Sequence, residues 1–429
     1  MRWFDGLAAV AVAALAAYLV SLPPLSALEG PAFDLLLRAR QELYGPELYA
    51  RLPPANGATA SASPVIVVAL DQETALRPPF DRLPQELWTP QMAEVMRWVL
   101  DAGALVIAQQ EAFVASAESA VAGYDADYLE LLRSAGAEGR IVLGRRAPAP
   151  DRLGPTPAHA DAVGGDRNVR HIALHSDADG VLRHAALYES SRDRSGTVSL
   201  NPSLALELAA RVIGERPHLL YGSDLMLGRY AIPGSDVNAM LLNFQGGDGG
   251  IPVFSLGDLY ACAEAGDDGF FRKHFDDKVV VFGRTDLPRV RRVTAARFLD
   301  LHLADRYAPR CRLDVIESLV GRDNAATTPE VVVTATAVRN LLQREAVKSV
   351  PPAVVVVIAA LLALATVWAV FRHASYLAGG AIVLLLAGWG YLAVVMLARE
   401  TWLIPLAQPA VAVATAFVAA WLYKAVRRL

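Results

Sequence analysis

The sequence predicts a mixed α/β protein, in which a mostly parallel β-sheet covered by helices is joined to a four-helix transmembrane region. Apolar residues are concentrated at the two ends of the 429-residue chain, while the middle has the composition of a soluble domain. In that middle part, short β-branched runs alternate with helical stripes, the pattern of a parallel sheet with covering helices. Lys and Arg flank the apolar runs at positions that fall on one side of a membrane.

The N-terminal segment MRWFDG precedes an apolar run of about 20 residues, near the lower length for a membrane span. The competing interpretation is a cleavable signal peptide, because Leu25-Ser26-Ala27 lies where a peptidase could cut. We assign residues 1–28 to an N-terminal transmembrane anchor, for a reason given below.

Residues 29–350 are soluble in character and begin as strands alternating with helices. The β-branched run at 65–70 is short enough for a strand buried on both faces. Further strands are expected at 104–108 and 141–144, and a second helix at 127–134. The first helix is indicated by an apolar stripe made of Trp88, Met92, Val95, Met96 and Val99.

The segment 168–188 predicts a β-hairpin that turns at the sequence DADG. In that hairpin His171, His175 and His184 would share one face, where they could bind zinc or copper or respond to external pH. The alternative is a solvated sheet surface. A helix at 202–213 and strands at 240–244 and 278–283 follow.

The stretch from Pro329 begins as a helix with Val331, Ala335, Val338 and Leu342 on one face, which we expect to pack on the domain. It continues through Pro351-Pro352 into the first of three apolar runs, so residues 351–429 are expected to form three transmembrane helices with a short basic tail. We expect the link between the domain and these helices to be rigid. The basic residues Arg2, Arg372, Lys424, Arg427 and Arg428 would then lie on the cytoplasmic side, which places both termini inside and residues 29–350 outside.

Several segments together resemble the CHASE type 2 domain, an extracytoplasmic sensory domain that one span usually precedes and about three follow. The resemblance implies a bacterial inner-membrane protein with residues 29–350 in the periplasm and the first span retained, because FDLLLR directly follows it. The family usually continues into a cytoplasmic output domain, whereas only a short tail follows the last span here, so we expect the output to pass through a separate partner. The matching segments are FDLLLRAR (33–40), VIVVALDQET (65–74), GALVIAQQEAF (103–113), DADGVLRHAAL (177–187), PSLALELA (202–209), LLNFQG and IPVFSLGDLY (within 241–260), KVVVFGRT (278–285) and PEVVVTATAVRNLL (329–342).

The chain departs from the family pattern at charged positions. The family tends to carry two successive acids after the first strand, where this chain has Asp71 and Gln72. It commonly carries an aromatic-Asp pair after the second strand, where this chain has Gln109 and Gln110. Gln245 stands where the family often has Arg. These losses suggest a different ligand or a site that is no longer used.

Ligands of open parallel sheets bind outside the carboxyl ends of the strands. The polar residues at those ends could hold a small polar or anionic molecule; Arg146 and Asp286 lie beside them. The alternative is that these groups pair with one another and cap helices, as buried charges usually do. The candidate ligand-binding residues are Asp71, Glu73, Gln110, Glu111, Arg145, Gln245 and Arg284.

Several function classes have no support in the sequence. A net charge of -4 without a basic face argues against nucleic-acid binding. No GxSxG, HExxH, CxxC or paired-carboxylate motif occurs, and QGGDGG lacks the Lys-Ser/Thr of a phosphate loop, so we expect neither an enzyme nor a cofactor or metal.

Cys262 and Cys311 lie in a region where a disulfide is permitted, and the sequence does not decide whether they meet. The stretch 284–297 has five arginines. They could contact anionic lipid headgroups or the acidic surface of a partner protein, or they could lie in a solvated loop.

The function expected from the sequence is a membrane-anchored extracytoplasmic sensor that binds an unidentified small molecule or senses pH and relays the signal through its transmembrane helices. The alternative is a docking or assembly subunit of a larger membrane complex. The expected partners are membrane lipid and a second protein, or a further copy of the chain, bound through the transmembrane helices.

Overall fold

The computed structural model divides the chain into two compact units, which we describe separately. Residues 56–346 form the α/β unit, and residues 1–55 with 347–429 form the helical unit. The sequence analysis grouped residues 29–55 with the soluble region; their contacts place them in the helical unit. The structure describes residues 3–20, 22, 27–51, 63–111, 113–146, 154–172, 174–192, 198–219, 225–234, 239–245, 250–299, 309–316 and 326–427.

The α/β unit is built on a six-stranded sheet in which every pair of neighbouring strands is parallel. Its central strands are almost entirely apolar because helices cover both faces. The parallel sheet predicted from the alternating pattern is therefore confirmed. In spatial order the strands are β13 (Val253–Ser255), β1 (Val65–Leu70), β14 (Val279–Arg284), β2 (Val106–Gln109), β3 (Ile141–Arg145) and β4 (Val169–His171).

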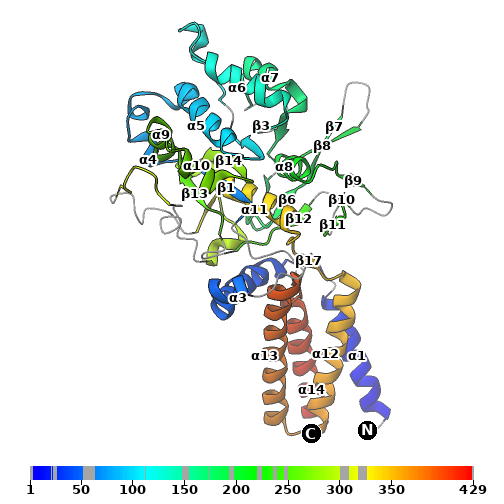
Figure 1. Ribbon diagram of the computed structural model, residues 1–429. Helices are drawn as coiled ribbons and strands as arrows, with labels where there is room; N and C mark the ends of the chain where they lie inside the picture. The colour runs from blue at the N-terminus through cyan, green and yellow to red at the C-terminus, as the bar shows by residue number, and fades with distance from the viewer. Residues whose placement is uncertain are drawn as a thin grey trace. The chain divides into compact units, whose positions relative to one another are not determined.

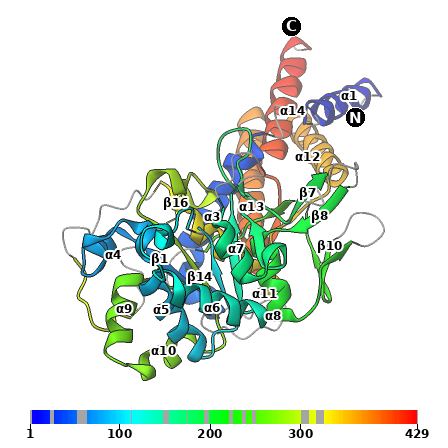
Figure 2. The same cartoon turned by 90° about the horizontal axis from the view of Figure 1, so that it is seen from above.

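Helices cover the two faces of the sheet unequally (Figures 1 and 2). The larger layer packs on the face that carries Ile66, Val68, Ile107 and Phe282 and contains the main hydrophobic core. The opposite face is covered by two helices that pack against each other. The first layer comprises α5 (Thr89–Asp101), α6 (Ala126–Ala137), α7 (Pro157–Val163), α9 (Leu256–Glu264) and α10 (Asp268–Phe275), and the second comprises α8 (Leu204–Ile213) and α11 (Glu330–Gln343).

The helix α11 is the predicted amphipathic helix, but it is buried on nearly all sides rather than on one face. The main sheet, α8 and the short strand at residues 328–329 surround it. Even Thr334, Arg339 and Asn340 are therefore shielded from solvent. A close approach to β14 makes this possible, because a Cβ atom on Gly283 would lie 2.7 Å from a methyl carbon of Val331. Glycine at 283 is thus required by packing.

The hairpin predicted at 168–188 is only partly correct. His171 ends β4 in the parallel sheet, whereas His175 and His184 pair with each other in a separate three-stranded antiparallel sheet. The DADG segment is not a two-residue turn, because the chain between the paired strands runs from residue 176 to 183. The smaller sheets contain β5 (Leu174–His175), β6 (His184–Ala186) and β12 (Ala239–Leu241); β9 (His218–Leu219), β10 (Leu225–Leu227) and β11 (Tyr230–Ile232); β7 (Tyr188–Arg192) and β8 (Val198–Pro202); and β15 (Arg291–Arg292) and β16 (Thr328–Pro329).

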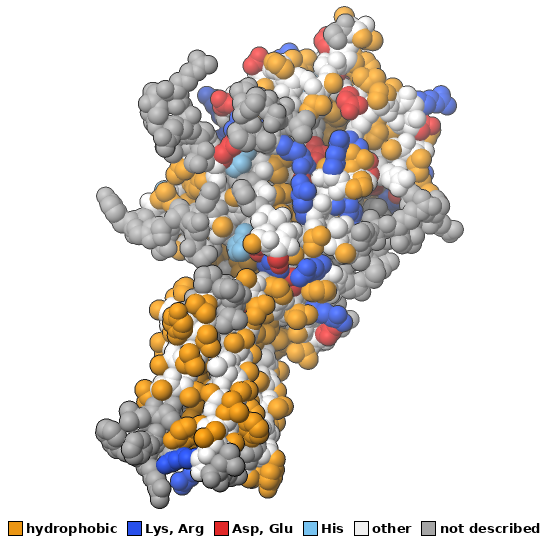
Figure 3. Space-filling model, turned by 180° about the vertical axis from the view of Figure 1, so that it is seen from behind, with side chains coloured by type: hydrophobic (Ala, Val, Ile, Leu, Met, Phe, Trp, Pro, Cys, Tyr) orange, Lys and Arg blue, Asp and Glu red, His pale blue; other side chains and the backbone are white. Residues whose placement is uncertain are grey.

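Within the helical unit, three of the described helices are long and apolar enough to cross a membrane: α12 (Pro352–Arg372), α13 (Ser375–Glu400) and α14 (Ala407–Val426). The predicted N-terminal span is the helix α1 (Trp3–Val20), which is not among those three, so its crossing of the membrane stays a prediction. Small side chains let α1, α12 and α14 approach one another closely, a feature that is also common where helices pack inside membranes. The buried alanines of this seam are Ala9, Ala13, Ala16, Ala359, Ala363, Ala412, Ala416 and Ala420. The apolar surface of the bundle is visible in Figure 3.

Two charged side chains cap the ends of helices that lie far from them in the sequence. Glu29, the first residue of α3 (Glu29–Arg51), accepts the backbone N–H groups of Leu406 (3.0 Å) and Gln408 (2.7 Å) at the start of α14. Lys424, near the end of α14, donates to the carbonyls of Val370 and His373 at the end of α12. These contacts fix the register of α14. Its end and the start of α1 lie at the same end of the bundle (Figure 1).

A short parallel pair of strands joins the chain that enters α12 to the loop between α13 and α14. The strands are β17 (Lys348–Ser349) and β18 (Trp402–Leu403). The Lys348 N–H also donates to the carbonyl of Thr401 at 2.8 Å. The entry to the transmembrane helices is thus hydrogen-bonded to a neighbouring loop.

Candidate functional site

The carboxyl end of β14 is a topological switch point of the sheet. The chain leaves β1 and β2 towards helices on the larger layer, whereas after β14 it reaches α11 on the opposite face. In open α/β sheets, ligands bind at such switch points, outside the carboxyl ends of the strands. The predicted residues Asp71, Glu111 and Arg284 lie at or just after the ends of β1, β2 and β14, and their role in ligand binding stays a prediction.

Glu330, the first residue of α11, is the centre of an ion-pair network in this region. Its side chain is only 2% exposed and pairs with Arg146, which follows β3, and with Arg292 at 2.7 Å. Arg146 also pairs with Glu111, which follows β2. Burial raises the pKa of Glu111, and the positive charges of Arg146 and Arg284 oppose this shift. The network thus ties the start of α11 to the ends of two strands.

Close backbone contacts support this arrangement. Gly144 of β3 lies so near to the chain leaving β2 that a Cβ atom there would be 2.1 Å from the carbonyl oxygen of Gln110. The Gln110 side chain is buried, and its amide oxygen has no hydrogen-bond partner among the described residues. A larger residue at 144 would displace the segment that carries Gln110 and Glu111.

Asp71 directly follows β1 and caps the short helix α4 (Gln72–Ala75). Its Oδ1 accepts hydrogen bonds from the N–H (2.7 Å) and hydroxyl (2.6 Å) of Thr74 and from the hydroxyl of Ser255 (3.1 Å). The carboxyl group is 5% exposed, and its Oδ2 has no partner in the described structure. Burial raises the pKa of Asp71 to about 6, against the lowering effect of the Thr74 hydrogen bonds.

Glu73, two residues further on, holds a distant part of the chain. Its buried carboxylate pairs with Arg77 at 3.0 Å and with Arg310. Arg77 in turn donates to the backbone carbonyl of Asp314. The segment 309–316 is therefore fastened to the end of β1.

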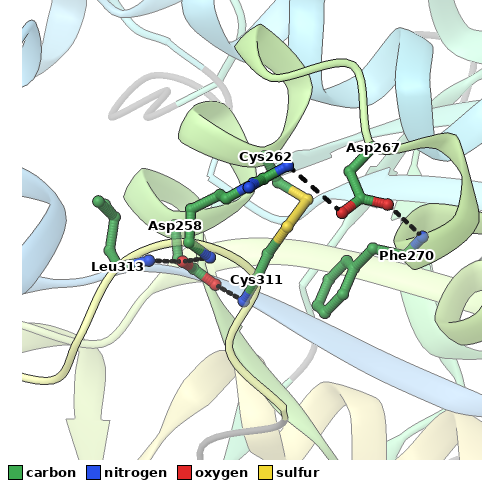
Figure 4. The surroundings of a disulfide bond; sticks show 7 residues. Asp258, Cys262, Asp267, Phe270, Cys311 and Leu313 are labelled. Atoms are coloured by element: carbon green, nitrogen blue, oxygen red, sulfur yellow. Dashed lines mark hydrogen bonds and ion pairs between the residues drawn. A yellow bond between two sulfur atoms is a disulfide. The ribbon is translucent and has the colours of Figure 1, made fainter.

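The same segment is attached to α9 by a disulfide and by a buried carboxylate (Figure 4). Cys262 of α9 is bonded to Cys311, with 5.8 Å between their Cα atoms. Asp258, one turn earlier on α9, accepts the backbone N–H groups of Cys311 (2.8 Å), Arg312 (3.0 Å) and Leu313 (2.7 Å). The disulfide that the sequence left undecided is thus present, and successive backbone N–H groups surround the carboxylate beside it.

Other predicted site residues form separate groups. Arg145 pairs with Glu189 at 3.1 Å, and Arg284 pairs with Asp286. Gln245 donates to Glu345 at 3.0 Å, just beyond the last turn of α11. That end of the helix is about 20 Å from Glu330 at 1.5 Å per residue. The structure therefore brings Glu111 near Arg284 and fastens Asp71 and Glu73 at β1, but Gln245 lies elsewhere.

The sequence analysis did not identify Glu330, Arg292, Arg310 or Asp258 as site residues. The sequence does carry a signal for Glu330, because it directly follows Pro329 at the start of an apolar helix. Acidic side chains are favoured in the first turn of a helix. Arg310 and Asp258 carry none. Their partners come from parts of the chain far apart in sequence, which only the folded structure brings together.

The histidines and the arginine-rich stretch are also bound within the fold. His171 lies 3.7 Å from Glu189, and His184 lies 3.0 Å from Asp177, on different sheets, so these two do not form the shared face that was expected. In the stretch 284–297, Arg284 pairs with Asp286, Arg292 pairs with Glu330, and Arg291 donates to Thr327. Much of its positive charge is therefore used internally.

A family model for the CHASE2 domain matches residues 9–371, most of the chain. No curated protein and no solved structure matches it.

Proposed function

The chain belongs to the CHASE2 domain family of extracellular sensory domains, and on that premise we propose that it is an extracytoplasmic sensor that relays ligand binding to a separate partner protein. The proposed ligand is a small anionic molecule that carries a carboxylate or phosphate group. The proposed binding site is the arginine cluster at the switch point, formed by Arg146, Arg284 and Arg292.

The observation that carries this proposal is the position of Glu330. It is the first residue of α11, and it is held by two arginines that could equally pair with an anionic ligand. A ligand carboxylate that takes Arg146 and Arg292 would leave Glu330 buried without its partners. Because an unpaired buried charge is strongly unfavourable, the N-terminus of α11 would then have to move.

The route from the site to the membrane helices is covalent. α11 ends at Gln343, Arg344 adopts the left-handed conformation with φ of 59°, and α12 begins at Pro352. α11 and α12 are therefore separate helices joined by residues 344–351, and the rigid link expected from the sequence stays a prediction. A shift of α11 would be passed on through residues 344–351.

Ligand binding can be measured on the full-length protein in lipid nanodiscs by thermal unfolding with succinate or inorganic phosphate. A ligand at 100 times its Kd stabilises the native state by about 2.7 kcal/mol, or roughly 5 °C for a domain of this size. Arg146→Gln should abolish the shift. The matched control is Arg133→Gln, because Arg133 pairs with Glu130 on the exposed surface of α6. A shift that survives Arg146→Gln would contradict the proposed site.

One observation favours the alternative function, a docking or assembly subunit. The arginines of this cluster already pair with carboxylates of the chain: Arg146 with Glu111, and Arg284 with Asp286. A structural role needs no ligand to complete these pairs. Under that alternative the protein would co-purify with a stoichiometric membrane partner, and neither anion would change its unfolding temperature.

We also propose that the protein lies in a bacterial inner membrane with both termini in the cytoplasm. The apolar helices and the family support membrane attachment, and the basic residues Arg372, Lys424 and Arg427 support the orientation. Protease added to intact spheroplasts should cleave within residues 29–350 and spare an epitope at the C-terminus. Removal of that epitope from intact cells would contradict the orientation.

A further inference from the structure

A cavity of about 410 Å³ lies on the outer face of α5, away from the carboxyl-end site. Glu94, Trp98 and Asp101 line it from α5, one or two helical turns apart. Asp127 of α6 and Tyr260 of α9 form its sides. The volume is within the usual range for small-molecule sites.

The two aromatic rings of the cavity are held in place from behind. Trp98 stacks on Phe271 of α10, with ring centroids 5.4 Å apart and an interplanar angle of 28°. Tyr260 meets Phe80 edge to face, also at 5.4 Å. Both rings are partly exposed on the cavity side, so they offer fixed π surfaces to a ligand without rearrangement.

The charge of the cavity is negative. Its lining contains three carboxylates, Glu94, Asp101 and Asp127, against the single guanidinium of Arg97. None of these three, nor the nearby Glu264, forms an ion pair with a Lys or Arg among the residues that the structure describes. Burial and then the charge of Glu264 raise the pKa of Glu94. Burial, with the charges of Glu264 and Glu94, raises the pKa of Tyr260 to about 12. Both shifts report a negative local field, which the charge of Arg97 opposes only in part at Glu94.

A further polar group in the cavity lacks a partner. The side-chain oxygen of Gln91 is buried and accepts no hydrogen bond in the described part of the chain. That oxygen is closed off from solvent, so the carboxylates are the acceptor groups that a ligand in the cavity would meet. An anion would be repelled by the three carboxylates, so this cavity differs in chemistry from the arginine cluster at the carboxyl end of β14.

We infer that this cavity binds a linear di- or triamine. Ammonium groups separated by short alkyl chains would reach the carboxylates of α5 and α6, and the alkyl segments would lie against Trp98 and Tyr260. An ammonium group over an aromatic face gains a further cation–π attraction. A bare divalent metal ion fits less well, because no three carboxylates of the cavity lie close enough together to hold one among the described residues, and aromatic rings supply no metal ligand.

The inference can be tested by thermal unfolding and calorimetric titration of the full-length protein in nanodiscs with spermidine and putrescine. Spermidine should bind, and Glu94→Gln should weaken its affinity about tenfold. Trp98→Leu should weaken the affinity by a similar factor, because it removes the aromatic ring. Glu130→Gln is the matched control, because Glu130 is an exposed carboxylate of α6 that does not line the cavity. The control variant should bind spermidine as the unmodified protein does.

Two outcomes would overturn the inference. One is the absence of binding at 10 mM spermidine, roughly the weakest affinity worth assigning to a site. The other is binding that Mg²⁺ reproduces at equal charge, or that Glu94→Gln and Glu130→Gln reduce equally, since either would indicate general attraction to a negative surface. Should Glu94→Gln unfold the protein, the exposed Asp127→Asn gives the same test.

Discussion

Removing the disulfide between Cys262 and Cys311 should destabilise the α/β unit strongly. The bond closes a loop across a sequence separation of 49 residues and attaches the segment 309–316 to α9. These are the two cysteines of the chain, so the double variant Cys262→Ser, Cys311→Ser removes the bond without leaving a free thiol. The same bond can be broken by a dithiol reductant.

The size of the effect follows from the length of the loop. In the chain-entropy description, closing a loop of about 50 residues stabilises the native state by about 4 kcal/mol at 25 °C. A domain of this size loses roughly 2 °C in Tm for each kcal/mol. The expected fall in Tm is therefore about 8 °C. The hydrogen bonds from residues 311–313 to Asp258 remain, so the segment need not detach.

The assay is differential scanning of the full-length protein in nanodiscs, with and without reductant. The reductant should lower the Tm of the unmodified protein to that of the double variant, and it should leave the variant unchanged. Alkylation without prior reduction should modify neither cysteine. A Tm that changes by less than about 1 °C on reduction, or two alkylated cysteines in the untreated protein, would refute the reasoning.

Three further changes test the contacts of α11 and of the carboxyl-end site. Gly283→Ala should cost about 1 to 3 kcal/mol of unfolding free energy through its clash with Val331, and Val331→Ala in the same chain should recover part of that loss. Glu330→Gln should cost about 3 kcal/mol, because two arginines lose a buried carboxylate. The pKa of Asp71 in the native state is raised to about 6, so the native state holds this proton more tightly than the unfolded state does. The stability that the neutral carboxyl group contributes is therefore lost as pH rises. Relative to the Asp71→Asn variant, the unmodified protein should lose up to about 3 kcal/mol of unfolding free energy between about pH 4 and pH 7.

Each of these three predictions would be contradicted by a specific result. Additive costs for Gly283→Ala and Val331→Ala in a double-mutant cycle of urea unfolding would mean that the two side chains do not clash. Arg292→Gln serves as the control for Glu330→Gln, because Arg292 is 43% exposed and its loss should cost less than about 1 kcal/mol. If the difference in stability between the unmodified protein and the Asp71→Asn variant stays constant across this pH range, the carboxyl group titrates normally.

Sequence patterns predicted the parallel sheet because β1, β2, β3 and β14 are continuous apolar runs, and such runs report burial on both faces. They did not predict β13, since its three residues are too short to carry a pattern. They also misassigned His171, because a periodicity of two is the same in a hairpin and in an edge strand of the main sheet.

The chain by itself determined where water is excluded: the apolar runs at the end, the strand cores and the helix from Pro329 can be recognised because hydrophobicity is a property of each residue and its near neighbours. The tertiary structure alone decided which charges meet. Glu330 finds Arg146, and Asp258 finds the N–H groups of residues 311–313, across separations that local periodicity does not record. Pairing depends on distances set by packing of the whole sheet, so residue types indicated a polar site but not its partners.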